Sequence, residues 1–292
     1  MLPPEIVKKI KKIHIKSSRL VNTMMAGQYK SVFRGSGIEF EEVREYSPGD
    51  EVKSIDWKVS ARLGRPYIKR YREERELVVI LLVDMSASGN FGTTENLKRE
   101  TAAETAAILA FNAIRNNDKV GAILFTDTVE KYIPPKKGAS HVWRVIKEIF
   151  TFEPERTGTD IQNAVLYLGR VCRKKTVSFL ISDFLDKNYA KQLRMISKKH
   201  ELVGVLLSDP GDFHLPGAGI FYAQDFETGD FIELDASDEN TRKKYTEIKT
   251  KEHRIITSLL SSSDIDPVEI STADSPADEL TKYFRYREKR KR

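Results

Sequence analysis

A short loop in the sequence carries one carboxylate and two hydroxyl groups at regular spacing. It reads Asp84-Met-Ser86-Ala-Ser88 and directly follows the apolar run Leu77–Val83. Carboxylate and hydroxyl oxygens are hard ligands, which suit Mg²⁺, Mn²⁺ or Ca²⁺ rather than zinc. The Asp-x-Ser-x-Ser pattern alone is a weak signal, because Asp and Ser also form ordinary turns. It becomes informative if other loops bring matching groups to the same place.

Two further loops carry such groups where a helix begins or a strand ends. Thr157-Gly-Thr159-Asp160 opens one predicted helix, and Asp183 follows the apolar run Thr176–Ile181. Each has a simpler explanation, since Thr159 can cap the helix and Asp183 can be an ordinary loop aspartate. Ligands of α/β sheets bind at the carboxyl ends of the strands. The agreement of the three loops therefore favours a shared cation site.

The elements that position these loops alternate along the chain from about residue 76 onward. Four short apolar runs, each typical of a strand covered on both faces, are separated by segments with apolar residues at helical spacing. The runs are Leu77–Val83, Val120–Phe125, Thr176–Ile181 and Leu202–Leu207. Helices are predicted at 97–117, 141–150, 160–172, 187–200, 238–261 and 276–288, a short strand at 129–133, and a hairpin around the turn 227–230. This order predicts an α/β fold with a Rossmann-like, doubly wound, mostly parallel sheet.

The first 75 residues differ from the rest in pattern and in charge. They hold 17 Lys and Arg against 10 Asp and Glu, a surplus of seven, while the whole chain has a net charge of +6. The pattern indicates a basic helix at about 4–25, an exposed strand at 38–44, a short helix within 52–63 and a strand at 67–71. We therefore predict an N-terminal extension at 1–75 and an α/β domain at 76–292 with a basic tail. No recognised nucleic-acid motif accompanies the charge, so a nucleic-acid partner is not favoured.

Composition and apolar patterning indicate a cytoplasmic protein. No apolar run approaches the roughly 20 residues that a membrane-spanning helix needs. The lysines near the N-terminus are not followed by the apolar segment of a secretory signal. The single cysteine, Cys172, fits a reducing compartment and is predicted to be a buried, inert thiol.

Together, the three loops resemble the metal-ion-dependent adhesion site (MIDAS) of von Willebrand factor type A (vWA) domains. The segment 118–127 also resembles the usual second strand of that family, and the resemblance covers about residues 76–285. In vWA domains two serines and a threonine bind the metal directly, two aspartates act mostly through water, and an acidic side chain of a partner completes the octahedron. Thr159 is preferred to Thr157 because it directly precedes Asp160. The metal-site residues implied by the resemblance are Asp84, Ser86, Ser88, Thr159 and Asp183.

The N-terminal part resembles a more specific family. Segments 34–50 (RGSGIEFEEVREYSPGD), 55–62 (IDWKVSAR) and 66–75, in this order before the Asp-x-Ser-x-Ser strand, are similar to the bacterial domain of unknown function 58 (DUF58). Members of that family are commonly encoded beside MoxR-type AAA+ ATPases. The resemblance implies such an ATPase, or one of its substrates, as the partner in a chaperone-like assembly. Many members also carry N-terminal transmembrane helices, a pattern not seen in this sequence.

Enzymatic alternatives lack the groups that their chemistry needs. A haloacid-dehalogenase-type phosphatase has a second aspartate two positions after the first, where this chain has Ser86, a poor proton donor. The sequence has no P-loop, no Gly-x-Gly-x-x-Gly after the first strand and no Gly-x-Ser-x-Gly pattern. Its five histidines are scattered without metal-ligand spacing. A magnesium-dependent phosphohydrolase stays as a remote alternative.

The sequence therefore predicts a non-enzymatic protein-interaction module that holds Mg²⁺, or Mn²⁺ or Ca²⁺ in its place, and offers the metal to an acidic residue of a partner protein. The alternative is a structural subunit that binds through its basic N-terminal face while the metal site is vestigial. In that alternative Arg62, Arg65 and Arg70 make the contact.

Overall fold

The computed structural model describes residues 37–74, 76–217, 219–224 and 231–291, and the predicted basic helix at about 4–25 lies outside them. The chain divides into two compact units, Phe33–Leu77 and a larger unit that includes Val78–Arg292. The boundary predicted between residues 75 and 76 lies two residues before this division.

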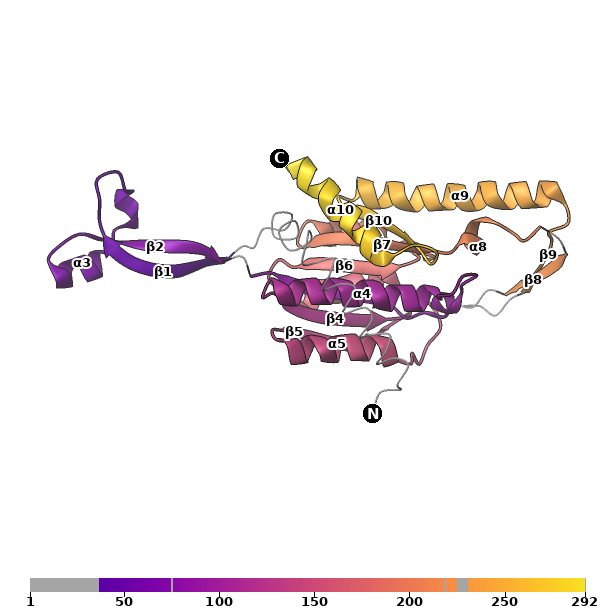
Figure 1. Cartoon of the computed structure of the whole chain (residues 1–292), viewed down its shortest axis with the longest axis horizontal. Coiled ribbons are helices and arrows are strands. Elements are labelled where there is room, and N and C mark those ends of the chain that lie inside the picture. Colours follow the sequence, from indigo (N-terminus) through magenta and orange to yellow (C-terminus); the bar gives the residue numbers. More distant parts are fainter. Residues whose placement is uncertain (1–36, 75, 218, 225–230, 292) are drawn as a thin grey trace. The chain divides into compact units, whose positions relative to one another are not determined.

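The smaller unit is an antiparallel two-stranded ribbon with a helical excursion between its strands (Figure 1). Asp56 begins the helix by accepting hydrogen bonds from first-turn amides, and Gly64, with a φ of 69°, ends it in the left-handed conformation. The two predicted strands and the short helix are confirmed. The elements are β1 (Gly37–Glu45), the 3₁₀ turn η2 (Val52–Ser54), α3 (Trp57–Leu63) and β2 (Tyr67–Glu74).

The larger unit is built on a six-stranded sheet in the order β10-β7-β6-β3-β4-β5. All neighbouring strands are parallel except β4 and β5. The strands are β3 (Val78–Asp84), β4 (Lys119–Phe125), β5 (Val129–Lys136), β6 (Val177–Ser182), β7 (Glu201–Ser208) and β10 (Asp266–Ser271). The mostly parallel, Rossmann-like sheet predicted from the sequence is thereby confirmed.

Helices cover both faces of this sheet. Helices α4, α5 and α10 lie on the face toward the viewer in Figure 1. On the other face α6, α7 and the C-terminal end of α9 pack in one apolar cluster with side chains of β3, β4, β6 and β7. The helices are η3 (Ala87–Asn90), α4 (Lys98–Arg115), α5 (Ala139–Thr151), α6 (Ile161–Val171), α7 (Ala190–Ser197), α8 (Pro210–Phe213), α9 (Glu239–Ser262) and α10 (Pro276–Lys291). The predicted hairpin is also present, as β8 (Ile220–Gln224) paired with β9 (Phe231–Asp235).

The edges of the sheet differ from the prediction. Strand β5 was expected to end before Pro134, yet it continues through both prolines to Lys136. It is an edge strand, and the outer side of an edge strand pairs with no other strand. A proline, which has no backbone N–H, therefore removes no hydrogen bond between strands on that side. Strand β10, the opposite edge, has no counterpart in the prediction because Pro267 and Glu269 interrupt its apolar pattern. Cys172 is buried directly after α6, and burial raises the pKa of its thiol.

Gly121 of β4 lies where the register between β4 and β5 shifts. A Cβ at this position would be 2.7 Å from the carbonyl oxygen of Ile133 and 2.9 Å from the nitrogen of Pro135. Both neighbours are backbone atoms, which cannot rotate away. We expect Gly121→Ala to lower the free energy of unfolding by about 1–3 kcal/mol, as measured by urea denaturation. Gly217→Ala is the matched control, since a Cβ there meets nothing within 4 Å; equal losses in the two variants would contradict the explanation.

Candidate metal site

Two aspartates lie at the ends of neighbouring parallel strands. Asp84 is the last residue of β3, and Asp183 directly follows β6, which pairs with β3 in parallel. The two carboxylates therefore lie at the same edge of the sheet. Together with Ser86 and Ser88 they line a cavity of about 10 Å³, which has room for one water-sized group. The structure thus brings four of the five predicted metal-site residues to one place.

The loop after β3 holds the two serines side by side. The Oγ atoms of Ser86 and Ser88 are 3.1 Å apart. Ser86 is extended, with φ and ψ of −60° and 166°, and the 3₁₀ turn η3 follows it. The backbone N–H of Ser86 donates to Asp84 Oδ1 at 2.9 Å, a local bond typical of aspartate in turns. These contacts fix the loop in a conformation in which both serines line the cavity.

Asp84 is engaged through both of its oxygens. Besides the bond from the Ser86 amide, Ser182 Oγ donates to Asp84 Oδ2 at 2.6 Å. Burial and the neighbouring charge of Asp183 raise the pKa of Asp84 to about 7, although the hydrogen bonds from Ser182 and Ser86 oppose the shift. An aspartate whose oxygens already accept hydrogen bonds suits contact with a metal through water. Ser182 is not among the predicted site residues; its signal in the sequence is its place at the last position of an apolar strand.

Thr159 is not among the residues that line the cavity. Its loop is nevertheless joined to the serine loop, because the Ala87 N–H donates to the Thr157 carbonyl at 2.9 Å. Asp160 caps α6 by accepting from the Asn163 N–H at 2.7 Å. A role of Thr159 as a metal ligand stays a prediction.

A lysine that the sequence does not single out lines the same cavity. Lys98 is the first residue of α4 and is only 3% exposed. Its Nζ lies 3.3 Å from Asp183 Oδ2 and 2.9 Å from Asp212 Oδ2. Burial disfavours the ammonium group, but the charges of Asp183 and Asp212 outweigh it and raise the pKa of Lys98 above its usual value. The side chain therefore stays positively charged inside the site.

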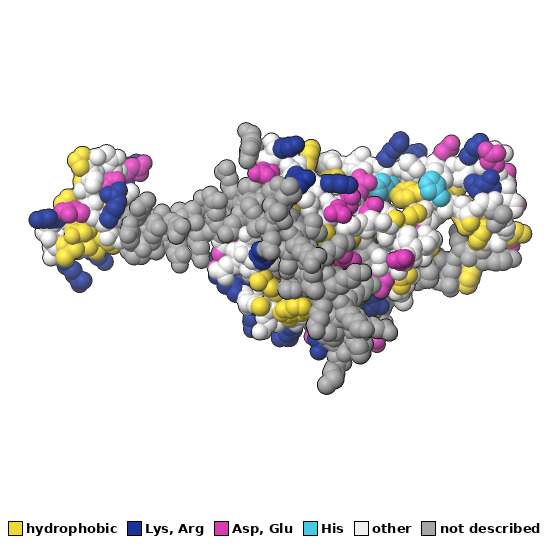
Figure 2. All heavy atoms as spheres, viewed as in Figure 1, with side chains coloured by type: hydrophobic (Ala, Val, Ile, Leu, Met, Phe, Trp, Pro, Cys, Tyr) yellow, Lys and Arg dark blue, Asp and Glu magenta, His cyan; other side chains and the backbone are white. Residues whose placement is uncertain are grey.

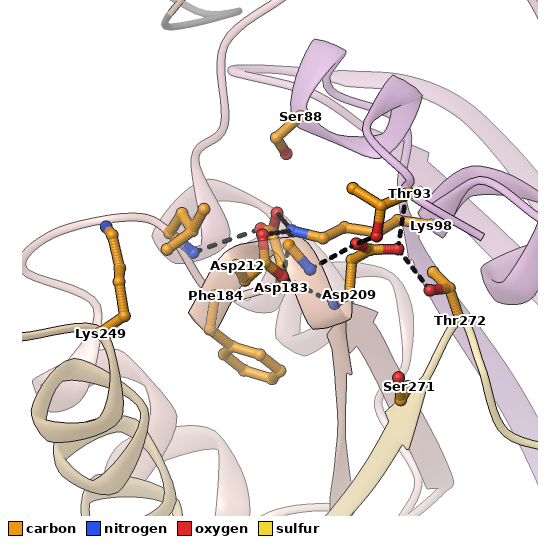
Figure 3. A network of polar contacts seen from close by, with 12 residues as sticks. Ser88, Thr93, Lys98, Asp183, Phe184, Asp209, Asp212, Lys249, Ser271 and Thr272 are labelled. Carbon is orange, nitrogen blue, oxygen red and sulfur yellow. Dashed lines mark hydrogen bonds and ion pairs between the residues drawn. The ribbon is translucent and has the colours of Figure 1, made fainter. Parts of the chain in front are cut away.

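Asp209 connects this ion pair to the neighbouring strand ends (Figure 3). Its fully buried carboxylate accepts hydrogen bonds from Thr93, Thr272 and the Gly211 amide. Burial alone would raise the pKa of Asp209, but these hydrogen bonds lower it below its usual value. The Asp209 N–H in turn donates to Asp212 Oδ2 at 2.7 Å. Asp212, the second partner of the buried lysine, is thus held in a fixed position.

The donors around the cavity fit a small, hard divalent cation. Two carboxylates and two hydroxyls are oxygen ligands of the kind that Mg²⁺ takes. Within the described ranges, no group of three or more His, Cys, Asp or Glu is placed to hold a metal. A cation held here would therefore need the serine hydroxyls as ligands beside the two carboxylates.

The raised pKa of Asp84 has a consequence for stability. From its usual value of 3.8 to about 7 the folded chain keeps a proton that the unfolded chain releases, so the free energy of unfolding falls as the pH rises through this window. For metal-free protein we expect a decline of up to about 1.4 kcal/mol per pH unit that is absent in Asp84→Asn. Chemical denaturation at several pH values between about 5 and 8 measures it. Asp274→Asn, at an exposed aspartate, should keep the wild-type slope; parallel curves for wild type and Asp84→Asn would rule the explanation out.

Comparisons with known proteins identify similar sequences over most of the chain. The family model described as "Protein of unknown function DUF58" matches residues 42–255. An uncharacterized protein of Mycobacterium bovis is 31% identical over 229 residues, which cover 77% of this chain and 72% of that protein. The uncharacterized protein YeaD of Bacillus subtilis is 32% identical over 108 residues, 37% of this chain and 25% of its own length.

Solved structures show weaker likenesses. The conserved hypothetical protein BatB from Bacteroides thetaiotaomicron has a TM-score of 0.47 at 17% identity, covering 73% of this chain and 99% of that one. The SpRpn10 VWA domain has a TM-score of 0.42 at 10% identity, covering 70% and 94%. Among the described residues, no helix combines the length and apolar character needed to cross a bilayer. The family match and the mycobacterial relative show that this chain belongs to the DUF58 family.

Proposed function

We propose that this chain is a metal-dependent protein-recognition module rather than an enzyme. The observation that carries the proposal is the cavity at the strand ends, where Asp84, Ser86, Ser88 and Asp183 meet. Four hard oxygen donors from two adjacent strand ends match the chemistry of Mg²⁺, with Mn²⁺ and Ca²⁺ as substitutes.

In this proposal each side chain has a distinct task. Ser86 and Ser88 hold the cation through their hydroxyls, while Asp84 and Asp183 balance its charge. When bound, the cation supplies one open coordination position to an acidic side chain of the partner. Arg99 also lines the cavity and adds a positive charge beside it, while its guanidinium group donates a hydrogen bond to the Phe152 carbonyl.

The partner that we propose is a MoxR-type AAA+ ATPase or one of its substrates, met in the cytoplasm. This identification rests on the family resemblance, and the site adds a chemical condition: the partner must present a Glu or Asp side chain. Its binding is then expected to require both the divalent metal and that carboxylate.

Metal binding is tested by isothermal titration of Mg²⁺ and Mn²⁺ into chelator-stripped protein. We expect saturable binding by the wild type and its loss in Asp84→Ala, because the variant removes a carboxylate that balances the cation. Asp274→Ala, at an exposed aspartate outside the cavity, should bind as the wild type does. A wild type that takes up neither metal, even with a candidate partner present, would overturn the proposal.

A second candidate function has its own support in the smaller unit. Figure 2 shows hydrophobic side chains on this unit, with basic and acidic side chains around them. Trp57 is 69% exposed, Val52 is 61% exposed and Leu63 is 57% exposed. Within residues 52–65 there are four basic residues and one acidic residue, Asp56, which is buried and caps α3. An exposed apolar and basic surface of this kind suits an acidic protein partner.

Charge reversal separates the two candidates. If the basic surface makes the contact, Arg62→Glu combined with Arg65→Glu should weaken partner binding by about tenfold or more, while Asp84→Ala leaves it unchanged. The proposed metal-dependent function predicts the opposite pattern. Pull-down of the candidate ATPase with and without chelator, using each variant as bait, measures both effects. The predicted third arginine, Arg70, has a side chain outside the described part of the structure.

A further inference from the structure

An ammonium group is built into the candidate metal site. Lys98 is almost completely buried, and its Nζ contacts Asp183 at 3.3 Å and Asp212 at 2.9 Å. The ring of Phe91 lies 5.4 Å from the same nitrogen. A lysine is very rarely buried unless it is paired. The two carboxylates explain its burial, and one of them is a predicted metal-site residue.

We propose that Lys98 determines how firmly this site holds a divalent cation, because its ammonium group shares Asp183 with the metal. The inference rests on the proposed function and extends it. Without metal, the ammonium balances Asp183 and keeps the site folded. With metal, the two cations compete for one carboxylate, so the wild type holds the metal weakly unless a partner's carboxylate also binds.

Asp212 sets the strength of this competition. It lies on α8 and accepts a hydrogen bond from the Asp209 N–H, while Asp209 is itself held by Thr93 and Thr272 (Figure 3). Asp212 attracts the Lys98 ammonium group toward α8, and this weakens the ion pair between that group and Asp183. Loss of the Asp212 charge should therefore weaken metal binding, whereas loss of the Lys98 charge should strengthen it.

The size of the effect follows from Coulomb's law. A divalent ion about 6 Å from an ammonium group is disfavoured by about tenfold even at the dielectric constant of water, and by more in a cavity. Lys98→Met should therefore bind Mg²⁺ at least about tenfold more tightly than the wild type. Asp212→Asn should bind it several-fold more weakly. The two variants are thus expected to shift the affinity for Mg²⁺ in opposite directions. This difference distinguishes competition for the Asp183 carboxylate from a general loosening of the site.

The experiment is isothermal titration of Mg²⁺ and Mn²⁺ into chelator-stripped wild type, Lys98→Met and Asp212→Asn, with thermal unfolding of each with and without metal. Lys98→Met leaves the buried carboxylate of Asp183 and the half-buried carboxylate of Asp212 without their cation, which destabilises the metal-free fold. The double variant Lys98→Met/Asp212→Asn also removes the charge of Asp212. It replaces Lys98→Met in the titration if that single variant does not fold. We expect a larger rise in the unfolding temperature on adding Mg²⁺ for both Lys98 variants than for the wild type.

The outcomes separate this inference from the proposed function. If the wild type binds metal and neither Lys98 variant binds it more tightly, the role of Lys98 is overturned and the metal-dependent function stands. If only the Lys98 variants bind, the role of Lys98 is supported, and the wild type is then titrated with the candidate partner present. Metal uptake in that titration supports the metal-dependent function, and no uptake overturns it. If no form binds metal, even with the candidate partner present, both are overturned.

Discussion

Two carboxylates share one small cavity, and the surrounding contacts offset the cost of keeping them there. Asp84 and Asp183 leave neighbouring parallel strands at the same edge, so the topology of the sheet brings like charges together. Removal from water and the proximity of a like charge both disfavour the ionised form. The Ser182 hydroxyl and the Ser86 amide donate to one carboxylate, and the Lys98 ammonium group pairs with the other. These contacts lower the cost of placing the two carboxylates together, although burial and the charge of Asp183 still raise the pKa of Asp84 to about 7.

The contacts that compensate these charges extend to β7 and β10, two strands that contribute no predicted metal ligand. Lys98 also binds Asp212, which is fixed by the backbone amide of Asp209. Asp209 collects hydrogen bonds from Thr93, in the loop before α4, and from Thr272, after β10. The ends of β7 and β10 are thereby joined to the cavity through buried polar contacts, each of which is costly to break. The site is therefore one network of charges rather than two loops with four side chains.

The central part of the fold is readable from the sequence because strands buried on both faces consist of apolar runs. Edge strands are less visible, since an edge tolerates prolines and charged residues. Asp84 could be predicted because it directly follows an apolar run, and Asp183 because only Ser182 separates it from another. Lys98 could not be, because in the sequence it is one charge among many, and only its contacts with Asp183 and Asp212, 85 and 114 residues away, make it part of the site. Its one local signal is a basic residue in the first turn of a helix, where the helix dipole disfavours positive charge.

In the proposed function, the balance of charges in the cavity couples the binding of the metal to the binding of the partner. Two acidic side chains, Asp84 and Asp183, and two basic ones, Lys98 and Arg99, line the cavity. A bound divalent cation leaves this set with a positive surplus, and a partner's carboxylate offsets the surplus. Each ligand then strengthens the binding of the other, as thermodynamic linkage requires. A cavity with the same acidic residues and no lysine would hold the cation tightly by itself and would gain less from the partner. The buried ammonium group thus favours joint binding of metal and partner over binding of metal alone.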